Sequence, residues 1–198
     1  MTDRSSPSLA ELCDTLIHSR QHISPKHLGP PGPDDATLRQ LLAAATAAPD
    51  HRQLRPWRFL VLGPAAREAL GQAFAQALRE RDPAATEAQQ AEARDKALRG
   101  PVLLLAVVDL RAEAPDVAPM ERVLSLGCAM QNLMLAAQAR GLASGLSSGR
   151  ALASAPLRQA FDLVEGEHAL CFLTLGTPRR SQPPRPRPAV DDIARWVP

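Results

Sequence analysis

The chain has 198 residues, of which 45% are hydrophobic, so it is long enough to bury a substantial core without disulfides or a structural metal. Its 23 basic and 21 acidic side chains leave a net charge of only +2, which argues against a dedicated nucleic-acid-binding protein. Aromatic residues make up 3% and tyrosine is absent, so a stacking platform for single-stranded bases is not expected.

The three cysteines, Cys13, Cys128 and Cys171, are odd in number and far apart, with no C-x-x-C motif and no histidine at ligand spacing. This pattern predicts three reduced, buried thiols rather than a disulfide framework or a zinc site. The segment Met1–Pro7 lacks the apolar run of a signal peptide. The longest apolar run, around 102–110, is far below the ~20 residues of a membrane helix, so we expect a cytoplasmic protein.

The first third of the chain predicts two helices followed by a strand. Ser8 and Glu11 fit a capping box at the start of a helix over about 8–20, and the proline-rich stretch that follows ends it. A second helix is predicted over about 34–48, with an aspartate at its start. Residues 57–62 predict a strand that ends at a Gly-Pro pair.

The middle of the chain alternates helices with a strongly apolar strand. Residues 65–81 predict one helix, and 83–99 predict another that carries few large apolar side chains, as in a solvated, mobile helix that covers a pocket. Residues 101–110 form an apolar run typical of a strand buried on both faces. The helix predicted over 119–141 is apolar on nearly every side, so it must be buried inside the domain or against a second subunit.

The last third predicts a short helix over 156–163, a third strand over 169–175 and a tail rich in proline and arginine. Helices outnumber strands without regular alternation, which indicates the α+β class. We expect one domain over residues 1–198, with a flexible N-terminus at 1–7 and an extended tail at 179–198. The tail ends in an apolar cluster of Val190, Ile193, Trp196 and Val197.

Two polar loops are candidate ligand sites. The end of the first predicted helix, 18–22, carries Arg20, whose guanidinium is a good phosphate ligand; the alternative is a polar helix end in which the arginine compensates the dipole. The loop over 48–57 carries His51, which can donate to a ring atom, and Trp57, which can form a pocket wall. Its alternative is a capped helix end with Trp57 in the core.

Two further segments carry small or basic residues. Gly141–Gly149 lets the backbone approach a flat ligand, but it fits neither G-x-G-x-x-G nor G-x-S-x-G, so a Rossmann phosphate loop and a serine hydrolase are disfavoured. The tail arginines can bind an anionic ligand or a partner, or form a solvated tail. No carboxylate pair, Cys/His dyad or metal cluster is evident, so an enzyme built on this chain would depend on a cofactor.

The order of these motifs resembles the nitroreductase superfamily, and in particular its short bacterial branch of FMN-dependent NAD(P)H oxidoreductases. The resemblance runs from about Leu12 to Trp196, nearly the whole chain. It is carried by Ser19-Arg20-Gln21, by Ala48-Pro-Asp-His51 with Pro56-Trp57-Arg-Phe59, by Gly127-Cys-Ala-Met-Gln-Asn-Leu-Met-Leu-Ala-Ala137, by Gly141 to Gly149, and by Leu173-Thr-Leu-Gly-Thr-Pro178.

This resemblance implies a central, mainly antiparallel sheet flanked by helices, in an intertwined homodimer with two FMN sites at its interface. The long apolar helix would be the spine of that dimer. It also implies a ping-pong reaction in which NADH or NADPH reduces FMN, and a nitroaromatic, a quinone or a similar small acceptor then takes the electrons. No catalytic side chain is required, and neither nucleic acid nor membrane is an expected partner.

The family pattern assigns cofactor contacts to eight residues of this sequence. Arg20 matches the second arginine of an Arg-Arg-Ser loop, whereas Ser19 and Gln21 replace its other members; Leu146 stands where a tryptophan is common. Losing one arginine and one aromatic wall predicts weaker FMN binding than in typical members. The predicted contacts are Ser19, Arg20, Gln21, His51, Leu146, Ser147, Ser148 and Arg187, with Arg185 as the second candidate in the tail.

Three hypotheses follow from the sequence. The first is an FMN-dependent oxidoreductase. The second is a redox-inactive flavin-binding or regulatory member of the same fold, motivated by the departures at Ser19 and Leu146. The third is a helical interaction protein without a cofactor, motivated by the Ala/Gln/Glu/Arg-rich helix and the basic tail.

Overall fold

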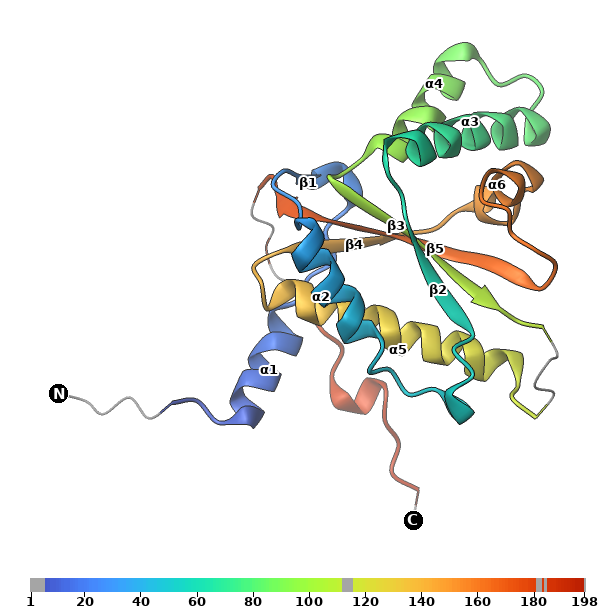
Figure 1. Cartoon of the computed structure of the whole chain (residues 1–198). Helices are drawn as coiled ribbons and strands as arrows, with labels where there is room; N and C mark the ends of the chain where they lie inside the picture. Colours follow the sequence, from blue (N-terminus) through green and yellow to red (C-terminus); the bar gives the residue numbers. More distant parts are fainter. Residues whose placement is uncertain (1–5, 112–115, 181–182, 184, 198) are drawn as a thin grey trace.

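A five-stranded sheet lies between two layers of helices in the computed structural model, which describes residues 6–111, 116–180, 183 and 185–197 (Figure 1). The strands are β1 (Leu28–Gly29), β2 (Trp57–Val61), β3 (Val102–Asp109), β4 (Ala143–Ser147) and β5 (Glu167–Pro178). The α-helices among the described residues are α1 (Leu9–Ser19), α2 (Asp35–Ala45), α3 (Pro64–Arg81), α4 (Glu87–Asp95), α5 (Pro119–Gln138) and α6 (Ala155–Ala160).

The strand order is β1-β5-β3-β2, with β4 also pairing with β5, and every one of these pairs is antiparallel. The long strand β5 is therefore the centre of the sheet: its residues 167–175 pair with β3, 172–176 pair with β4, and 177–178 pair with β1. The predicted α+β class and mainly antiparallel sheet are confirmed.

Strand β3 separates the two layers of the core. Leu103, Leu105 and Val107 pack with side chains of α3 and α6, while Leu104 packs with α2 and α5 on the opposite face. Because both faces are covered, the strand needs apolar side chains at every position, which explains the continuous apolar run predicted to be buried. Figure 1 shows α2 and α5 on one side of the sheet and α3, α4 and α6 on the other.

Two predicted segments have a different structure. The stretch from Gly141 to Gly149 contains strand β4, because residues 143–147 pair with β5 despite their low strand propensity. The helix predicted over 83–99 is shorter: a capping box of Thr86 and Gln89 starts α4 at Glu87, and the chain after Asp95 continues as a 3-10 turn.

Helix α1 forms as predicted from its Ser8–Glu11 capping box, but none of its residues is buried. It contacts the C-terminal part of α5, but this contact leaves the apolar face of α1 exposed in one protomer. The prediction of three buried thiols is therefore wrong for Cys13, which is exposed; Cys128 is half-buried and Cys171 is buried, where desolvation raises the pKa of its thiol to about 11.

The C-terminal tail is without regular structure over 185–189, as expected, and then forms a 3-10 turn over Val190–Asp192. Residues 181, 182, 184 and 198 of the tail, and 1–5 of the N-terminal segment, lie outside the described residues. Within the described ranges, no helix is both long and apolar enough to cross a membrane.

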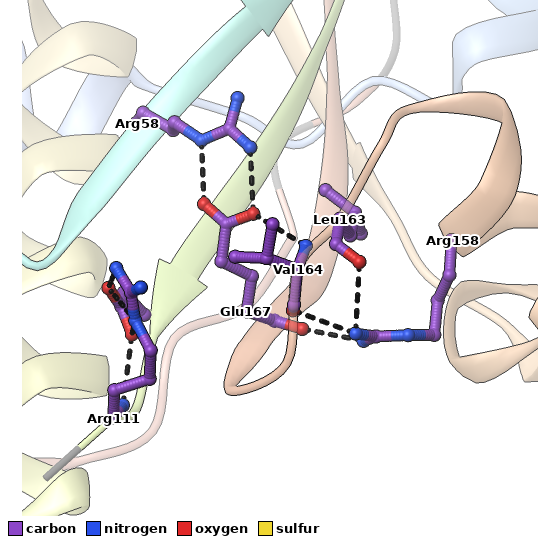
Figure 2. Close-up of polar contacts among 7 residues, drawn as sticks. Arg58, Arg111, Arg158, Leu163, Val164 and Glu167 are labelled. Carbon is purple, nitrogen blue, oxygen red and sulfur yellow. Dashed lines mark hydrogen bonds and ion pairs between the residues drawn. The ribbon is translucent and has the colours of Figure 1, made fainter.

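A network of polar contacts joins the start of β5 to its surroundings (Figure 2). The guanidinium of Arg58 on β2 donates twice to the carboxylate of Glu167, at 2.9 Å each, and the Val164 amide donates to the same carboxylate at 3.2 Å. Arg158 donates to the carbonyl oxygens of Leu163, Val164 and Glu167. These bonds attach the loop between α6 and β5 to the sheet.

Replacing Glu167 by glutamine is expected to destabilise the fold by about 1 kcal/mol at pH 7, because a bidentate ion pair between this buried carboxylate and the partly exposed Arg58 guanidinium is lost. The Arg58 hydrogen bonds lower the pKa of Glu167 in the folded protein. Its contribution is therefore complete above the unfolded-state pKa and is lost as pH falls through the folded value. Urea unfolding of both proteins from pH 7 to pH 3 should show the difference shrinking; a constant difference would contradict this assignment.

Candidate functional site

Arg20 is placed directly after α1, where the chain leaves the helix in an extended conformation. Its side chain is half-buried, and its Nε atom is fully buried without a hydrogen-bond partner among the described residues. Burial, and then the neighbouring Arg187, lower the pKa of this guanidinium, which still stays charged at neutral pH. A buried, charged donor without an acceptor is costly, so this position favours a bound anion.

The tail brings a second cation to the same place. The Arg187 guanidinium donates to the carbonyl oxygen of Arg20 at 2.7 Å, which ties the tail to the end of α1. Arg185 lies near enough to help lower the pKa of His22. The structure therefore gathers both predicted tail arginines around the loop that carries Arg20.

His22 connects this basic group to strand β4. Burial, followed by Arg185 and Arg20, lowers the pKa of the His22 imidazole, so the ring is neutral at pH 7. Its Nδ1 can then accept a hydrogen bond from the Leu146 amide, at 3.3 Å. The sequence motif over 18–22 contains this histidine, but nothing in its spacing distinguished it as a contact to β4.

The approach of the two segments depends on Gly145. The Ile23 amide donates to the carbonyl oxygen of Ser144 at 3.0 Å, and His22 and Ser144 form a parallel bridge. A methyl group on Gly145 would overlap the carbonyl oxygen of Ile23, which is backbone and cannot rotate away. A glycine at this position therefore lets the loop after α1 lie directly on β4.

A cavity of about 580 Å³ opens between the α3–α4 pair and the β4–β5 part of the sheet. Its volume falls in the range of small-molecule and cofactor sites. Residues 146–149 and His22 line one part of it. The apolar wall is formed by Leu70, Phe74, Leu103 and Phe172.

The predicted contacts are only partly brought together. Leu146, Ser147 and Ser148 line the cavity, and Arg20 and Arg187 meet beside His22, which lines it too. The Ser19 hydroxyl instead donates to the Leu16 carbonyl within its own helix and accepts from Gln138. The Gln21 side chain is half-buried and has no hydrogen bond within the described part of the chain.

His51 lies elsewhere in the protomer. It is in a 3-10 turn before β2, and its Nδ1 bonds the Glu121 carboxylate at 2.8 Å, which lowers the pKa of that acid. Glu121 is in the first turn of the 20-residue helix α5, whereas Gln138, which contacts Ser19, is its last residue. These positions are about 25 Å apart along the helix, so one protomer does not place His51 beside Arg20.

Trp57 belongs to the core rather than to the cavity wall. Its ring packs against the apolar clusters on the α5 side of the sheet, and its indole Nε1 donates to the Ser125 hydroxyl at 2.9 Å. The alternative interpretation of the 48–57 loop, with this tryptophan in the core, is therefore correct.

Several cavity residues were absent from the sequence-based site. Thr174 on β5 is fully buried, and its hydroxyl has no partner among the described residues. The helix predicted to cover a pocket does line the cavity, but its charged residues were not identified as ligands. The missed basic side chains are Lys96 and Arg99 of that predicted segment, together with Arg81 at the end of α3 and Arg150 after β4.

The described residues contain no group of three or more His, Cys, Asp or Glu side chains that could hold a metal ion. The chemistry available to the cavity from its own side chains is therefore hydrogen bonding and charge, supplied mainly by arginine, histidine, serine and threonine.

The mainly antiparallel sheet between two layers of helices defines the class as α+β, and comparison with known proteins identifies the family. Residues 20–177 match the nitroreductase family, and the chain belongs to it. It is 34% identical over 168 residues to "Putative NAD(P)H nitroreductase YdjA" of Escherichia coli K12, covering 84% of this chain and 87% of that protein.

Solved structures agree with the fold. A nitroreductase-like family protein from Bacillus cereus superposes with a TM-score of 0.78 at 21% identity, covering 100% of this chain and 98% of that one. The FMN-dependent nitroreductase NfnB from Mycobacterium smegmatis, in complex with NADPH, superposes with a TM-score of 0.72 at 19% identity, covering 96% and 100%. At these identities the likeness concerns the fold alone.

Proposed function

We propose that this protein is an FMN-dependent oxidoreductase that passes electrons from NADH or NADPH to a nitroaromatic, a quinone or a similar small acceptor. The observation that carries the proposal is the buried, unpaired Nε of Arg20, beside Arg187 and next to a cavity of cofactor size. Membership of the nitroreductase family supports it, as does the shared fold with NfnB, an FMN-dependent nitroreductase. The same membership disfavours the helical interaction protein without a cofactor.

The residues present fit FMN. A phosphate can accept hydrogen bonds from Arg20 and Arg187, with Arg185 adding charge, and this would satisfy the orphaned donor. Leu146, Ser147 and Ser148 present an aliphatic side chain, two hydroxyls and backbone groups to the cavity, where they can orient a flat ring. Ser19 and Gln21 remain weaker candidates, because Ser19 already bonds within its helix.

Held by these residues, FMN would supply two-electron redox chemistry, and the cavity would admit the electron donor and the acceptor in turn. The chain's own residues bind and orient the cofactor, and the walls of Leu70, Phe74, Leu103 and Phe172 exclude water from its reactive face. No side chain is required as an obligatory acid or base, and we assign none as catalytic.

We further propose a homodimer in which α5 is the spine. Met120 and Leu124 on α5 are 75% and 67% exposed, and Trp196 in the tail is 81% exposed. Figure 1 shows α1 and the tail on the α5 side of the molecule, projecting away from the sheet. Two copies packed antiparallel along α5 would bury these side chains and bring the His51 end of one helix to the Arg20 end of the other.

Mixed dimers test this arrangement. Arg20→Ala and His51→Ala homodimers should each bind FMN poorly, because every site lacks one contact. A dimer with one copy of each variant has one site lacking both residues and one intact site, so it should recover about half of the wild-type FMN content. Co-expression with two affinity tags isolates that dimer for absorbance measurement. A mixed dimer no better than the two parents would show that the sites are not shared.

The spectrum of the untreated purified protein tests the main proposal. We expect a yellow protein with flavin absorption bands that are bleached by NADH or NADPH and restored by a nitroaromatic or a quinone. A colourless protein that takes up no added FMN would overturn it. The redox-inactive alternative predicts bound FMN that neither nucleotide reduces, and stopped-flow absorbance separates the two.

A further inference from the structure

The cavity is strongly basic beyond the residues assigned to the cofactor phosphate. Arg81 at the end of α3, Lys96 and Arg99 after α4, and Arg150 after β4 all line it, against the single carboxylate of Glu92. The cavity lining therefore has an excess of cations, whereas the whole chain carries a net charge of only +2.

Three of these cations have no counter-ion among the residues that the structure describes. No hydrogen bond or ion pair engages the guanidinium groups of Arg81, Arg99 or Arg150 in the part of the chain that the structure describes. Lys96 and Glu92 are 3.8 Å apart and exposed, so they partly neutralise each other. Unpaired cations around a concave, partly apolar site raise the local concentration of anions.

The segment that presents Arg99 is held in place. The Arg67 guanidinium on α3 donates to the carbonyl oxygens of Ala97, Arg99, Gly100 and Pro101, at 2.7–3.3 Å. Gly100 has a φ of +68° and packs against Thr174 so closely that a methyl group there would overlap the threonine side chain. The backbone that carries Arg99 is therefore fixed over the cavity.

One wall of the cavity is apolar and lies next to a buried hydroxyl without a hydrogen-bond partner among the described residues. Phe74 and Phe172 stack edge to face, with ring centroids 5.7 Å apart, next to Leu70 and Leu103. The buried Thr174 hydroxyl lines the same space without a partner among the described residues. This combination suits a flat, apolar ring that bears an anionic group at one edge.

We propose that this cavity selects second substrates that carry an anionic oxygen group, which Arg81, Arg99 and Arg150 bind. The inference rests on the proposed function and adds the chemical class of molecule that enters beside FMN. These arginines come from the α3–α4 pair and the turn after β4, whereas Arg20 and Arg187 come from the loop after α1 and the tail. A carboxylate on the acceptor and the phosphates of the nucleotide donor are two sources of the same chemistry.

Two pairs of unreactive ligands, tested on the flavin-loaded protein, distinguish binding of an acceptor carboxylate from binding of a nucleotide phosphate. Benzoate and benzamide differ by one charge at nearly equal shape, and NADP⁺ and NAD⁺ differ by one phosphate. Binding is followed by perturbation of the flavin spectrum and by calorimetry, at low and high salt. We expect benzoate to bind about tenfold more tightly than benzamide at low salt, with the preference reduced at high salt. A preference confined to NADP⁺ assigns the cations to the nucleotide phosphate.

Substitution of the three cavity arginines tests whether they produce the preference for the charged ligand. Arg81→Gln, Arg99→Gln and Arg150→Gln should each reduce the charge preference about threefold, and the triple variant should abolish it. Arg39→Gln is the matched control, because it removes the same charge from the exposed surface of α2, on the other side of the sheet. It should leave the preference unchanged.

The outcomes are distinct. Equal binding within both ligand pairs, or a preference that survives the triple variant, overturns the inference. Loss of FMN from the arginine variants also overturns it, since these cations would then hold the cofactor. A wild-type protein that takes up no FMN overturns the proposed function instead, and calorimetry with benzoate and benzamide on that protein still decides the anion preference.

Discussion

Replacing Arg20 by alanine is expected to weaken FMN binding by about 10- to 100-fold, which corresponds to the loss of a hydrogen-bonded charge contact of about 1.5–3 kcal/mol. The buried Nε of Arg20 lacks a partner in the described ranges, so its contact with a phosphate is gained without breaking a bond to any of those residues. Fluorescence quenching of FMN, titrated with apoprotein, measures the dissociation constant directly.

Ser19→Ala is the matched control for this experiment. The Ser19 hydroxyl is engaged with the Leu16 carbonyl and with Gln138, both at 3.3 Å, on the exposed surface of α1. We expect its removal to change FMN affinity less than about threefold. Arg187→Gln should fall between the two, because the tail arginine is exposed and contacts the backbone of Arg20. Wild-type affinity in Arg20→Ala would show that the phosphate lies elsewhere.

Replacing Gly145 by alanine is expected to cost about 3 kcal/mol of stability and to lower Tm by roughly 6–12 °C. The added methyl group would overlap the Ile23 carbonyl oxygen, so the loop after α1 must move away from β4. That movement breaks the bond between Ile23 and Ser144 and displaces His22 and Arg20. FMN should therefore be lost at temperatures at which the protein is still folded.

Gly63→Ala controls for the general cost of replacing a glycine. Gly63 is the N-cap of α3, has an ordinary negative φ of −73° and has open space where a Cβ would be built. We expect a loss below about 1 kcal/mol and unchanged FMN binding. Thermal unfolding with and without FMN distinguishes the two variants. Equal effects of both substitutions would show that the contact between Ile23 and Gly145 is not tight.

The structure changes the significance of the departures from the family pattern. Ser19 stands in place of an arginine, but the structure places Arg185 and Arg187 near the same loop, so cationic charge at that place comes from the tail. Leu146 stands in place of an aromatic wall; it lines the cavity and packs against the core clusters on the α5 side. We infer that weaker stacking, rather than weaker phosphate binding, is the main expected consequence.

Local signals predicted most of the elements. The Ser8–Glu11 capping box, the aspartate before α2 and the Gly63-Pro64 pair each mark a boundary that the structure has. The prediction of β3 as a doubly buried strand is correct because its apolar run is continuous. Strand β4 was not predicted, because its residues, Ala-Ser-Gly-Leu-Ser, have little strand propensity. They form a strand because they pair with β5.

The candidate site was predicted only in part, because some of its contacts, like the pairing of β4, join segments that are far apart in the sequence. Sequence patterns were sufficient for most helix starts, for the buried strand and for the family, because each depends on residues that are neighbours along the chain. Long-range packing, in contrast, brings Arg187 to Arg20, places His51 at the other end of α5, and gathers Arg81, Arg99 and Arg150 around one cavity. Those relations join segments that are far apart in sequence, and packing across the sheet, rather than local propensity, sets them.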